Sequence, residues 1–350
     1  MRTPPQPFAT RLLDWFDHHG RHDLPWQKNR TLYRVWVSEI MLQQTQVTTV
    51  IPYFTRFMQR FPNLKQLAGA EQDEVLEHWA GLGYYSRGRN LHKAARQIVN
   101  DHAGRMPRHI DALVALPGIG RSTAAAILSQ ALDQRHAILD GNVKRVLTRY
   151  HAIDGWPGER AVEERLWQLA ESLTPDARNA DYTQAIMDLG ATLCRRSRPD
   201  CEACPVRSGC RARERDEVTK YPASKPKRDK PVRSARLLVL IDDDGAVMLE
   251  KRPASGIWGG LWSLPELATE ADVEEVCRQR WGFELQRRTD EPVFRHSFSH
   301  YHLDIHPSLC ELGQGAQVSD SAGIMWQPKG GALPAVAAPV SRILERVVND

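Results

Sequence analysis

A change in the spacing of apolar residues near position 222 constrains the fold of this 350-residue chain more than any other feature. Over residues 8–214 apolar residues recur at helical spacing, with Pro and Gly between the segments. Beyond residue 233 the spacing becomes two, as in RLLVLI and AVMLEK around the acidic turn DDDG, which predicts a β-hairpin. The segment 222–233, PASKPKRDKPVR, has the Pro-rich, positively charged composition of an extended linker. We therefore predict an all-α domain at 1–221, this linker, and an α/β domain at 234–350.

The elements expected inside each domain follow the same periodicity. The first domain is expected to hold about ten helices, including 34–48, 109–115 and 121–132, and no segment of it has a strong strand pattern. In the second domain a helix near 271–280 follows the hairpin, and an alternating strand runs near 293–305. With 41% hydrophobic residues, the chain is long enough to give each domain its own core.

The distribution of charge is more informative than the net charge of +4. Positive side chains crowd one short segment and the linker after it: Arg195, Arg196, Arg198, Arg207, Arg211, Arg213, Lys225, Lys227, Arg228 and Lys230. Such clusters suit the phosphate backbone of a nucleic acid, although a solvated loop can have the same composition. No apolar run approaches the roughly 20 residues that span a bilayer, and the Pro-rich segment 1–8 lacks a signal-peptide core. We therefore expect a soluble cytoplasmic protein with no membrane partner.

Four of the six cysteines lie in one short segment with the spacing C-x6-C-x2-C-x5-C, at Cys194, Cys201, Cys204 and Cys210. A secreted disulfide protein would spread its cysteines through a small chain. These four are therefore expected to share a metal ion or a cluster in a reducing compartment. Zinc and an iron–sulfur cluster are both compatible with the spacing alone.

The string LPGIGRS at 116–122 joins two predicted helices and can bind an anion. Gly118 and Gly120 permit positive φ and leave backbone N–H groups uncovered at a helix N-terminus, where partial positive charge collects. Such a seat binds a DNA phosphate without reading bases, although Pro-Gly-x-Gly also occurs in ordinary helix–helix turns. Asp140 follows one helix later, in LDGNVKRVL, where it can cap the next helix.

The order of hairpin, helix and aspartate resembles the helix-hairpin-helix glycosylase superfamily, in which the aspartate faces the sugar of a flipped nucleotide. The string EIMLQQTQV, which begins with Glu39, is similar to that of MutY-type adenine DNA glycosylases, and the resemblance covers roughly 8–345. It implies that Glu39 is the general acid that protonates adenine at N7. It also implies that Asp140 stabilises the oxocarbenium-like sugar. From the residues alone, Glu39 could be a solvated helix residue, but its neighbours on that helix are apolar.

The same resemblance assigns residues that would handle the extruded nucleotide. Gln44 and Tyr84 match intercalating residues that fill the gap left by the base, and Gln184 and Trp26 match positions of the adenine pocket. Each of them can instead be an ordinary structural residue, and Trp26 can be plain core. Ser122 stands where lyase-competent relatives resembling endonuclease III carry a nucleophilic lysine. A monofunctional glycosylase that leaves an abasic site is therefore expected.

Two further assignments depend on the resemblance. Lys144, one helical turn past Asp140, could form a slow Schiff base with the sugar, but a phosphate contact or a surface position suits it better. The four cysteines are expected to hold a [4Fe–4S] cluster rather than zinc, because their spacing follows a helix-hairpin-helix domain. The cluster would hold the loop 194–210 as a stiff basic surface against DNA, a structural rather than a hydrolytic role.

The second domain resembles a Nudix domain whose metal site is damaged. Residues 259–282 keep the glycine-rich entry and Glu266 of a Nudix box. Arg278 and Gln279 stand where paired carboxylates would chelate Mg²⁺, so no pyrophosphatase activity is expected. The domain is therefore expected to be a binding module.

The string FRHSFSHYHLDIH at 294–306 is similar to the part of the C-terminal MutY-type domain that reads 8-oxoguanine. The resemblance places Phe298, Ser299 and His300 at the oxidised base. The alternating histidines of this string could also hold a metal, or simply belong to a half-buried strand.

Taken together, the resemblance implies a base excision repair enzyme that acts as a monomer near a bacterial nucleoid. Its partner would be double-stranded DNA with an 8-oxoguanine:A or G:A mispair, from which adenine is removed. The alternatives are an endonuclease III-like pyrimidine glycosylase with lyase activity, and a non-catalytic DNA-binding protein with a cluster. Ser122 and the second domain argue against the first alternative, and the presence of both Glu39 and Asp140 argues against the second.

Overall fold

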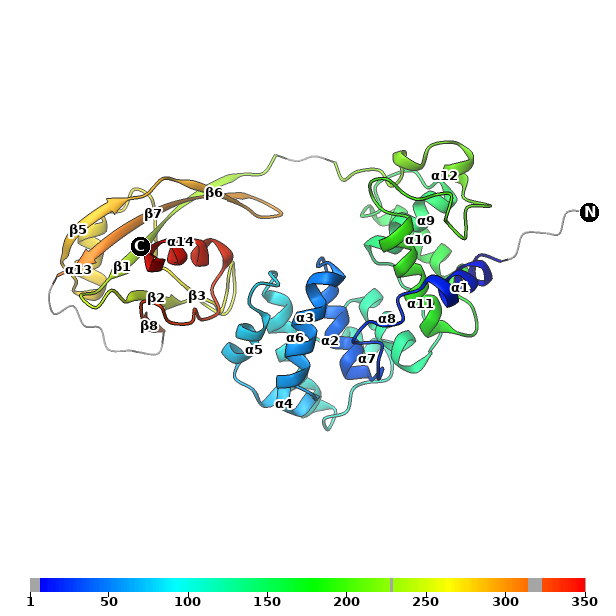
Figure 1. Ribbon diagram of the computed structural model, residues 1–350, viewed down its shortest axis with the longest axis horizontal. Coiled ribbons are helices and arrows are strands. Elements are labelled where there is room, and N and C mark those ends of the chain that lie inside the picture. The colour runs from blue at the N-terminus through cyan, green and yellow to red at the C-terminus, as the bar shows by residue number, and fades with distance from the viewer. Residues whose placement is uncertain (1–6, 227–228, 314–322, 350) are drawn as a thin grey trace, which may run out of the picture. The chain divides into compact units, whose positions relative to one another are not determined.

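The computed structural model describes residues 7–226, 229–313 and 323–349 (Figure 1). The chain forms two compact units, Met1–Ala70 with Arg89–Lys227, and Glu71–Gly88 with Arg228–Asp350. Only helices precede the linker in the described chain, and the strands, with two further helices, follow it, so the predicted change of secondary structure is confirmed. No helix in the described ranges is both long and apolar enough to span a membrane.

The helical part of the described chain contains α1 (Phe8–His19), α2 (Leu32–Leu42), α3 (Val47–Arg60), α4 (Leu64–Gly69), α5 (Gln72–Trp79), α6 (Ser86–Asp101), α7 (Ile110–Val114), α8 (Arg121–Leu132), α9 (Gly141–His151), α10 (Arg160–Leu173), α11 (Asn179–Asp188), the π-helix η1 (Leu189–Leu193), α12 (Arg211–Glu214) and the 3-10 helix η2 (Val218–Lys220). The apolar faces expected from the helical period form the core of the first unit. Leu12 and Phe16 of α1 pack there with Val143 of α9 and Ile186 of α11. On the other side of α8, α2 packs against both α8 and α3.

The predicted helix at 34–48 is wrong in its extent. The helix α2 ends at Leu42, and α3 begins at Val47. Gln44 lies between them with a φ of 58°, in the left-handed region that a right-handed helix excludes. The apolar pattern runs through this break because both helices bury one face, and apolar period alone does not reveal a two-helix corner.

The second unit contains one sheet covered by a helix on each face. Its described strands are β1 (Val232–Ile241), β2 (Val247–Lys251), β3 (Trp262–Ser263), β4 (Glu266–Leu267), β5 (Leu285–Asp290), β6 (Phe294–Ser297), β7 (His302–Leu312) and β8 (Ile324–Gln327). The main path is β3-β2-β1-β7-β5, with β1 and β7 parallel. Alternate residues of β1 face opposite helices: Leu237 and Val239 pack with α14 (Ala338–Asn349), and Leu238 and Leu240 pack with α13 (Val273–Trp281).

The strand predicted near 293–305 is also wrong, because it is two strands. β6 and β7 pair antiparallel, with Phe294 opposite Ile305 and Ser297 opposite His302. The residues between them, 298–301, form the turn. The alternation of side chains continues through this turn in the sequence, and it therefore reads as one strand. As a result the FSH residues lie at the tip of a hairpin.

Candidate active site

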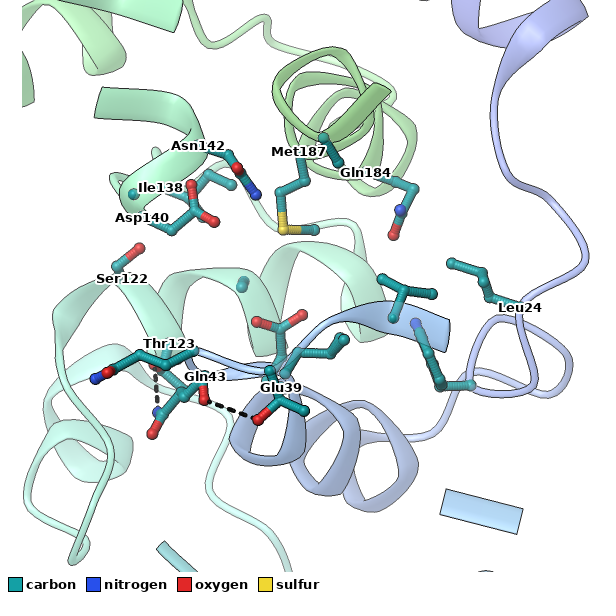
Figure 2. A pocket seen from close by; sticks show the side chains of 18 of the residues that line it. Leu24, Glu39, Gln43, Ser122, Thr123, Ile138, Asp140, Asn142, Gln184 and Met187 are labelled. Atoms are coloured by element: carbon teal, nitrogen blue, oxygen red, sulfur yellow. Dashed lines mark hydrogen bonds between the residues drawn. The ribbon is translucent and has the colours of Figure 1, made fainter. Parts of the chain in front are cut away.

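A cavity of about 420 Å³ lies in the first unit, and both predicted catalytic carboxylates line it. Glu39 comes from α2, and Asp140 stands directly before α9. Figure 2 shows Glu39 on one wall, with Asp140, Asn142, Gln184 and Met187 on the facing wall. These two acidic residues, about a hundred positions apart in the chain, therefore open into the same space.

The Glu39 carboxyl lies in a cavity wall that has both apolar and polar residues. Leu42, Thr123 and Ala126 are among the residues that line the same cavity. Burial raises the pKa of Glu39 to about 7, the negative charge of Asp140 adds to this rise, and a hydrogen bond from Gln130 opposes it. A carboxyl group with this pKa can carry a proton at neutral pH and can also release it.

Asp140 caps α9, as the sequence suggested. Its Oδ1 accepts a hydrogen bond of 2.7 Å from the backbone N–H of Val143. Burial raises the pKa of Asp140, whereas backbone N–H groups of Val143 and Asn142 and the nearby cations lower it. The hydroxyl of Ser122, at the start of α8, accepts from the backbone N–H of Leu139 at 2.9 Å and so ties the loop before Asp140 to α8.

A buried polar network, which the sequence reasoning missed, supports another part of the wall. Asp188 is fully buried and accepts from Arg21 Nε at 2.8 Å and from Arg21 Nη2 at 2.6 Å. It also accepts from Gln184 Nε2 at 2.7 Å, so the orientation of the Gln184 amide is fixed by a buried carboxylate. The spacing of four between Gln184 and Asp188 on α11 was the available signal.

Trp26 lines the cavity and is also core. Its side chain is buried and packs edge-on against Phe54 of α3, with ring centroids 5.5 Å apart. The core position of Trp26 is therefore established, and its contact with adenine stays a prediction. Gln184 is likewise buried and faces the cavity.

In the hairpin between α7 and α8, the backbone conformation requires glycine at one position. Gly118 has a φ of 78°, and a Cβ there would meet the Asn90 Cβ at 2.9 Å. Gly120 has a φ of −90° and space around its Cα, so the positive φ that glycine permits is adopted at Gly118 and not at Gly120. Gly120 instead precedes α8 as its cap residue, which leaves the N-terminal N–H groups of α8 beside the turn.

Gln44 and Tyr84 share an unusual backbone state. Gln44 is exposed with a φ of 58°, and Tyr84 is 52% exposed with a φ of 48°. A left-handed conformation costs free energy for residues other than glycine and is frequent at functional sites. Gln44 also lines the mouth of the cavity that contains Glu39.

Lys144 is engaged by a carboxylate of another helix. Its Nζ donates to Glu163 of α10 at 2.6 Å, and the Lys144 side chain is 22% exposed. Among the described residues that line the cavity there is no lysine.

The four cysteines of the 194–210 loop surround a separate small cavity of about 30 Å³. Within the described ranges, no three His, Cys, Asp or Glu side chains are arranged to hold a single metal ion. Burial raises the pKa of Cys204 to about 12, because a thiolate without a compensating cation is costly there. The four thiols line one cavity, and sulfur donors of this kind are ligands of both zinc and iron–sulfur clusters.

A buried arginine of α9 organises this loop and was not found from the sequence. Arg149 is 2% exposed, and its Nη1 donates to the Arg195 carbonyl at 2.7 Å and to Cys194 Sγ at 3.4 Å. One turn earlier, Arg145 donates to the carbonyls of Cys194 and Gly190, at 2.7 Å each. The cysteine loop is therefore attached to the same helix that Asp140 caps.

The exposed arginines of the loop differ in their partners. Arg195, Arg196, Arg198 and Arg207 are exposed, and Arg195 donates to the carbonyl of Arg198 at 3.1 Å. Arg207 and Arg213 both pair with Glu202, which reduces their availability to a phosphate. Lys227 and Arg228 lie outside the described residues.

In the second unit, Phe298 anchors the β6–β7 turn. Its ring stacks on Tyr301 with centroids 4.6 Å apart and contacts Trp258 at 5.6 Å. Ser299 and His300 are exposed at the tip, and their Oγ and Nδ1 atoms are 3.3 Å apart. Of the three FSH residues, one therefore packs and two are presented to solvent.

The residues of the damaged Nudix box pair with one another. Glu275 accepts from Arg278 at 2.7 Å and from Gln279 at 2.6 Å, while Glu266 accepts from Arg252 at 2.6 Å. The carboxylates of α13 and β4 are thus held by side chains of this unit.

Comparison with known proteins identifies both parts of the chain. Residues 37–172 match the HhH-GPD superfamily of base excision DNA repair proteins, and residues 236–346 match the NUDIX domain. Adenine DNA glycosylase of Buchnera aphidicola subsp. Schizaphis graminum is 38% identical over 341 residues, which cover 97% of this chain and 98% of that protein. Adenine DNA glycosylase of Homo sapiens is 39% identical over 360 residues, covering 85% of this chain and 65% of that protein.

Solved structures resemble the helical part. A thermostable thymine-DNA glycosylase, 29% identical, aligns with a TM-score of 0.55 over 59% of this chain and 95% of its own. Endonuclease III in a non-covalent DNA complex, 20% identical, shares the fold with a TM-score of 0.51 over 59% of this chain and 94% of its own. The predicted helix-hairpin-helix fold is confirmed by these matches. With relatives at this identity over nearly its whole length and both domains matched, the chain belongs to the adenine DNA glycosylases, the base excision repair enzymes that cleave the N-glycosidic bond of adenine in DNA.

Proposed function

We propose that this glycosylase removes adenine mispaired with 8-oxoguanine or guanine, with Glu39 as general acid and Asp140 as the group that stabilises the sugar cation. The observation that carries the proposal is the single cavity lined by both side chains. Cleavage of a glycosidic bond needs a proton on the leaving group and a negative charge near the developing oxocarbenium ion. Two carboxyl groups in different surroundings can divide these tasks.

The surroundings of the two carboxyl groups favour this division. Glu39, with its pKa near neutrality, gives its proton to N7 of the flipped adenine, and the C1′–N9 bond breaks as the electron pair leaves with the base. Asp140 receives backbone N–H bonds that favour its charged form, so it lowers the energy of the cation. A water then adds to C1′, and the Glu39 carboxylate takes its proton, which restores the acid.

The product of this scheme is an abasic site rather than a broken strand. A lyase needs an amine that attacks C1′, and Ser122 offers only a hydroxyl that already accepts from Leu139. Lys144 is held by Glu163. We therefore infer a monofunctional glycosylase that works as a single chain on duplex DNA.

We assign extrusion of the base to Gln44, which lines the cavity, and to Tyr84, an exposed residue that is not part of the cavity lining. Unstacking costs a few kcal/mol, which intercalation of Gln44 and Tyr84 would offset. Gln184 and Trp26 would contact the adenine inside the cavity, which both of them line. The N–H groups at the start of α8, beside Gly118 and Gly120, would seat a backbone phosphate, and Lys144 would add positive charge nearby.

We propose that Cys194, Cys201, Cys204 and Cys210 ligate a [4Fe–4S] cluster. When bound, such a cluster would supply a rigid cross-link within the loop, from Cys194 at the end of η1 to Cys210 directly before α12. The cavity lined by the four thiols supports this assignment. The exposed arginines of the loop would then be held in position against phosphates.

The second unit would recognise the oxidised base through its β6–β7 turn. Ser299 and His300 are exposed hydrogen-bonding groups at the tip, and Phe298 fixes the turn from below through its stack on Tyr301. Reading the edge of a nucleobase needs hydrogen-bond donors and acceptors in fixed positions. Polar residues at the tip of a turn that is held by stacked aromatic rings meet this need.

Replacing Glu39 by Gln should abolish adenine release while preserving DNA binding, because the amide has nearly the same shape but no acidic proton. The loss should be at least about a hundredfold in the single-turnover rate on 8-oxoguanine:A duplex. Strand scission after hot alkali measures base loss, and scission without alkali measures lyase activity. Turnover of Glu39→Gln near the parent rate would remove Glu39 from the mechanism, and breaks without alkali would contradict the monofunctional assignment.

The single-turnover rate should have a bell-shaped dependence on pH. It should fall as pH rises through about 7, because Glu39 loses its proton. It should also fall at acidic pH, where Asp140 becomes protonated at a pKa above its ordinary value. In Glu39→Gln the residual rate should lack the alkaline fall. A parent profile that is level on both sides of neutrality would contradict these roles.

Anaerobically purified protein should contain about four iron atoms and four sulfides per chain. Cys204→Ser should lose iron and bind duplex DNA more weakly, since the loop loses its cross-link. Cys277→Ser, at a cysteine buried in the other unit, is the matched control and should retain iron. One zinc per chain without iron would show that the cluster assignment is wrong.

Ser299→Ala should reduce the preference for 8-oxoguanine:A over G:A by about tenfold, the value of one lost base contact. Phe298→Ala should reduce it by about as much, because the turn loses the stack on Tyr301 that holds its tip in place. Ser341→Ala removes a hydroxyl from α14 of the same unit, where it donates to Glu345, and should leave the ratio unchanged. The measurement is the ratio of excision rates on the two duplexes. An unaltered ratio in both turn variants would exclude this turn from lesion recognition.

A further inference from the structure

A buried amide contacts the carboxyl group that the proposed mechanism uses as its acid. Gln130 lies near the end of α8, is 4% exposed, and donates from Nε2 to Oε1 of Glu39 at 2.7 Å. It belongs to the helix that begins at the hairpin, and that helix packs against α2, which carries Glu39. A buried side-chain amide aimed at one oxygen of a carboxyl group fixes both the position and the rotation of that group.

The donor also determines where the acidic proton sits. A carboxylic acid has one proton for two oxygens, and its unprotonated oxygen is the stronger hydrogen-bond acceptor, so the Gln130 N–H favours the proton on the other oxygen. We propose that Gln130 is a positioning residue that occupies Oε1 of Glu39, so that the proton resides on Oε2 and is delivered from there to the base. This inference rests on the proposed role of Glu39 as general acid.

The same hydrogen bond tunes the strength of the acid. An N–H donor favours the charged carboxylate and opposes the rise in pKa that burial causes. The other charged groups at the cavity are Asp140, whose charge raises the pKa of Glu39, and Arg21, which is paired with Asp188. On the helices that pack against α2, Arg121 of α8 is exposed and paired with Glu171, and Arg56 and Arg60 of α3 are exposed. Gln130 is therefore the neutral donor that acts on Glu39 directly.

The test compares the pH dependence of single-turnover adenine excision in the full-length parent, Gln130→Met and Gln130→Glu. Gln130→Met keeps the side-chain length but has no donor, so the alkaline fall should move to higher pH by about one unit. The maximal rate should drop about tenfold, because the proton is no longer directed. Gln130→Glu is nearly the same shape as the parent and would share a proton with Glu39, so its alkaline fall should also move upward.

Controls separate positioning from general damage. Gln134→Met removes a glutamine of the loop after α8 that donates to the Arg108 carbonyl, and its profile should match the parent. Duplex affinity and thermal unfolding of both Gln130 variants identify any loss of folding.

The outcomes are distinguishable from failure of the proposed function. If the parent releases no adenine, the proposed function itself fails. Suppose instead that the parent is active and that the excision rate of each folded Gln130 variant falls at the same alkaline pH as that of the parent. The positioning role is then overturned, even when the maximal rate of the variant is lower. An upward move in a folded variant, with the Gln134→Met profile unchanged, supports it.

Discussion

The desolvation of one carboxyl group is the constraint on which the rest of the site depends. Glu39 lies in the wall of a cavity, where burial of its carboxyl disfavours the charged form, so its pKa rises to about 7. A carboxyl on the surface would be ionised at neutral pH and could not protonate a base. The packing of α2 against α8 creates this environment, and the same packing brings Gln130 to Glu39. The stability of the helical core and the acidity of the site therefore have one origin.

The second carboxyl group depends on a different part of the fold. Asp140 is fixed by its role as the cap of α9, and α9 is in turn attached to the cysteine loop through Arg145 and Arg149. The close approach of η1 to this helix requires Gly190, because a Cβ there would lie 2.6 Å from the Asn142 Cβ. The cysteine loop 194–210 has no side chain in the catalytic cavity, but it helps to set the position of the cavity wall that contains Asp140. In the proposed scheme, this is the physical reason for a cluster that takes no part in the chemistry.

The sequence predicted the two-part architecture, because a change from helical to strand period is a property of local pattern. The resemblance singled out Glu39 and Asp140, which line one cavity, and their catalytic roles stay predictions. The sequence did not predict Gln130 or Asp188, since each acts on a partner that only tertiary packing brings near. The ends of helices and strands were predicted least well. The predicted helix 34–48 is two helices with a corner at Gln44, and the predicted strand near 293–305 is two strands joined by a turn. In both places the apolar pattern continued while the backbone changed direction.

The left-handed backbone of Gln44 has a consequence for the energetics of DNA binding. Its conformation is already present in the free protein, so the strain is compensated by folding of α2 and α3 around it. In the proposed scheme this side chain would enter the duplex without first unwinding a helical turn. A flexible loop would lose conformational entropy when it is ordered on DNA. A preformed corner would avoid this cost, so more of the free energy of the protein–DNA contacts would remain for unstacking the base. The corner between the two helices would then serve as a preformed wedge, and lesion search would need no slow rearrangement of the protein at each base pair.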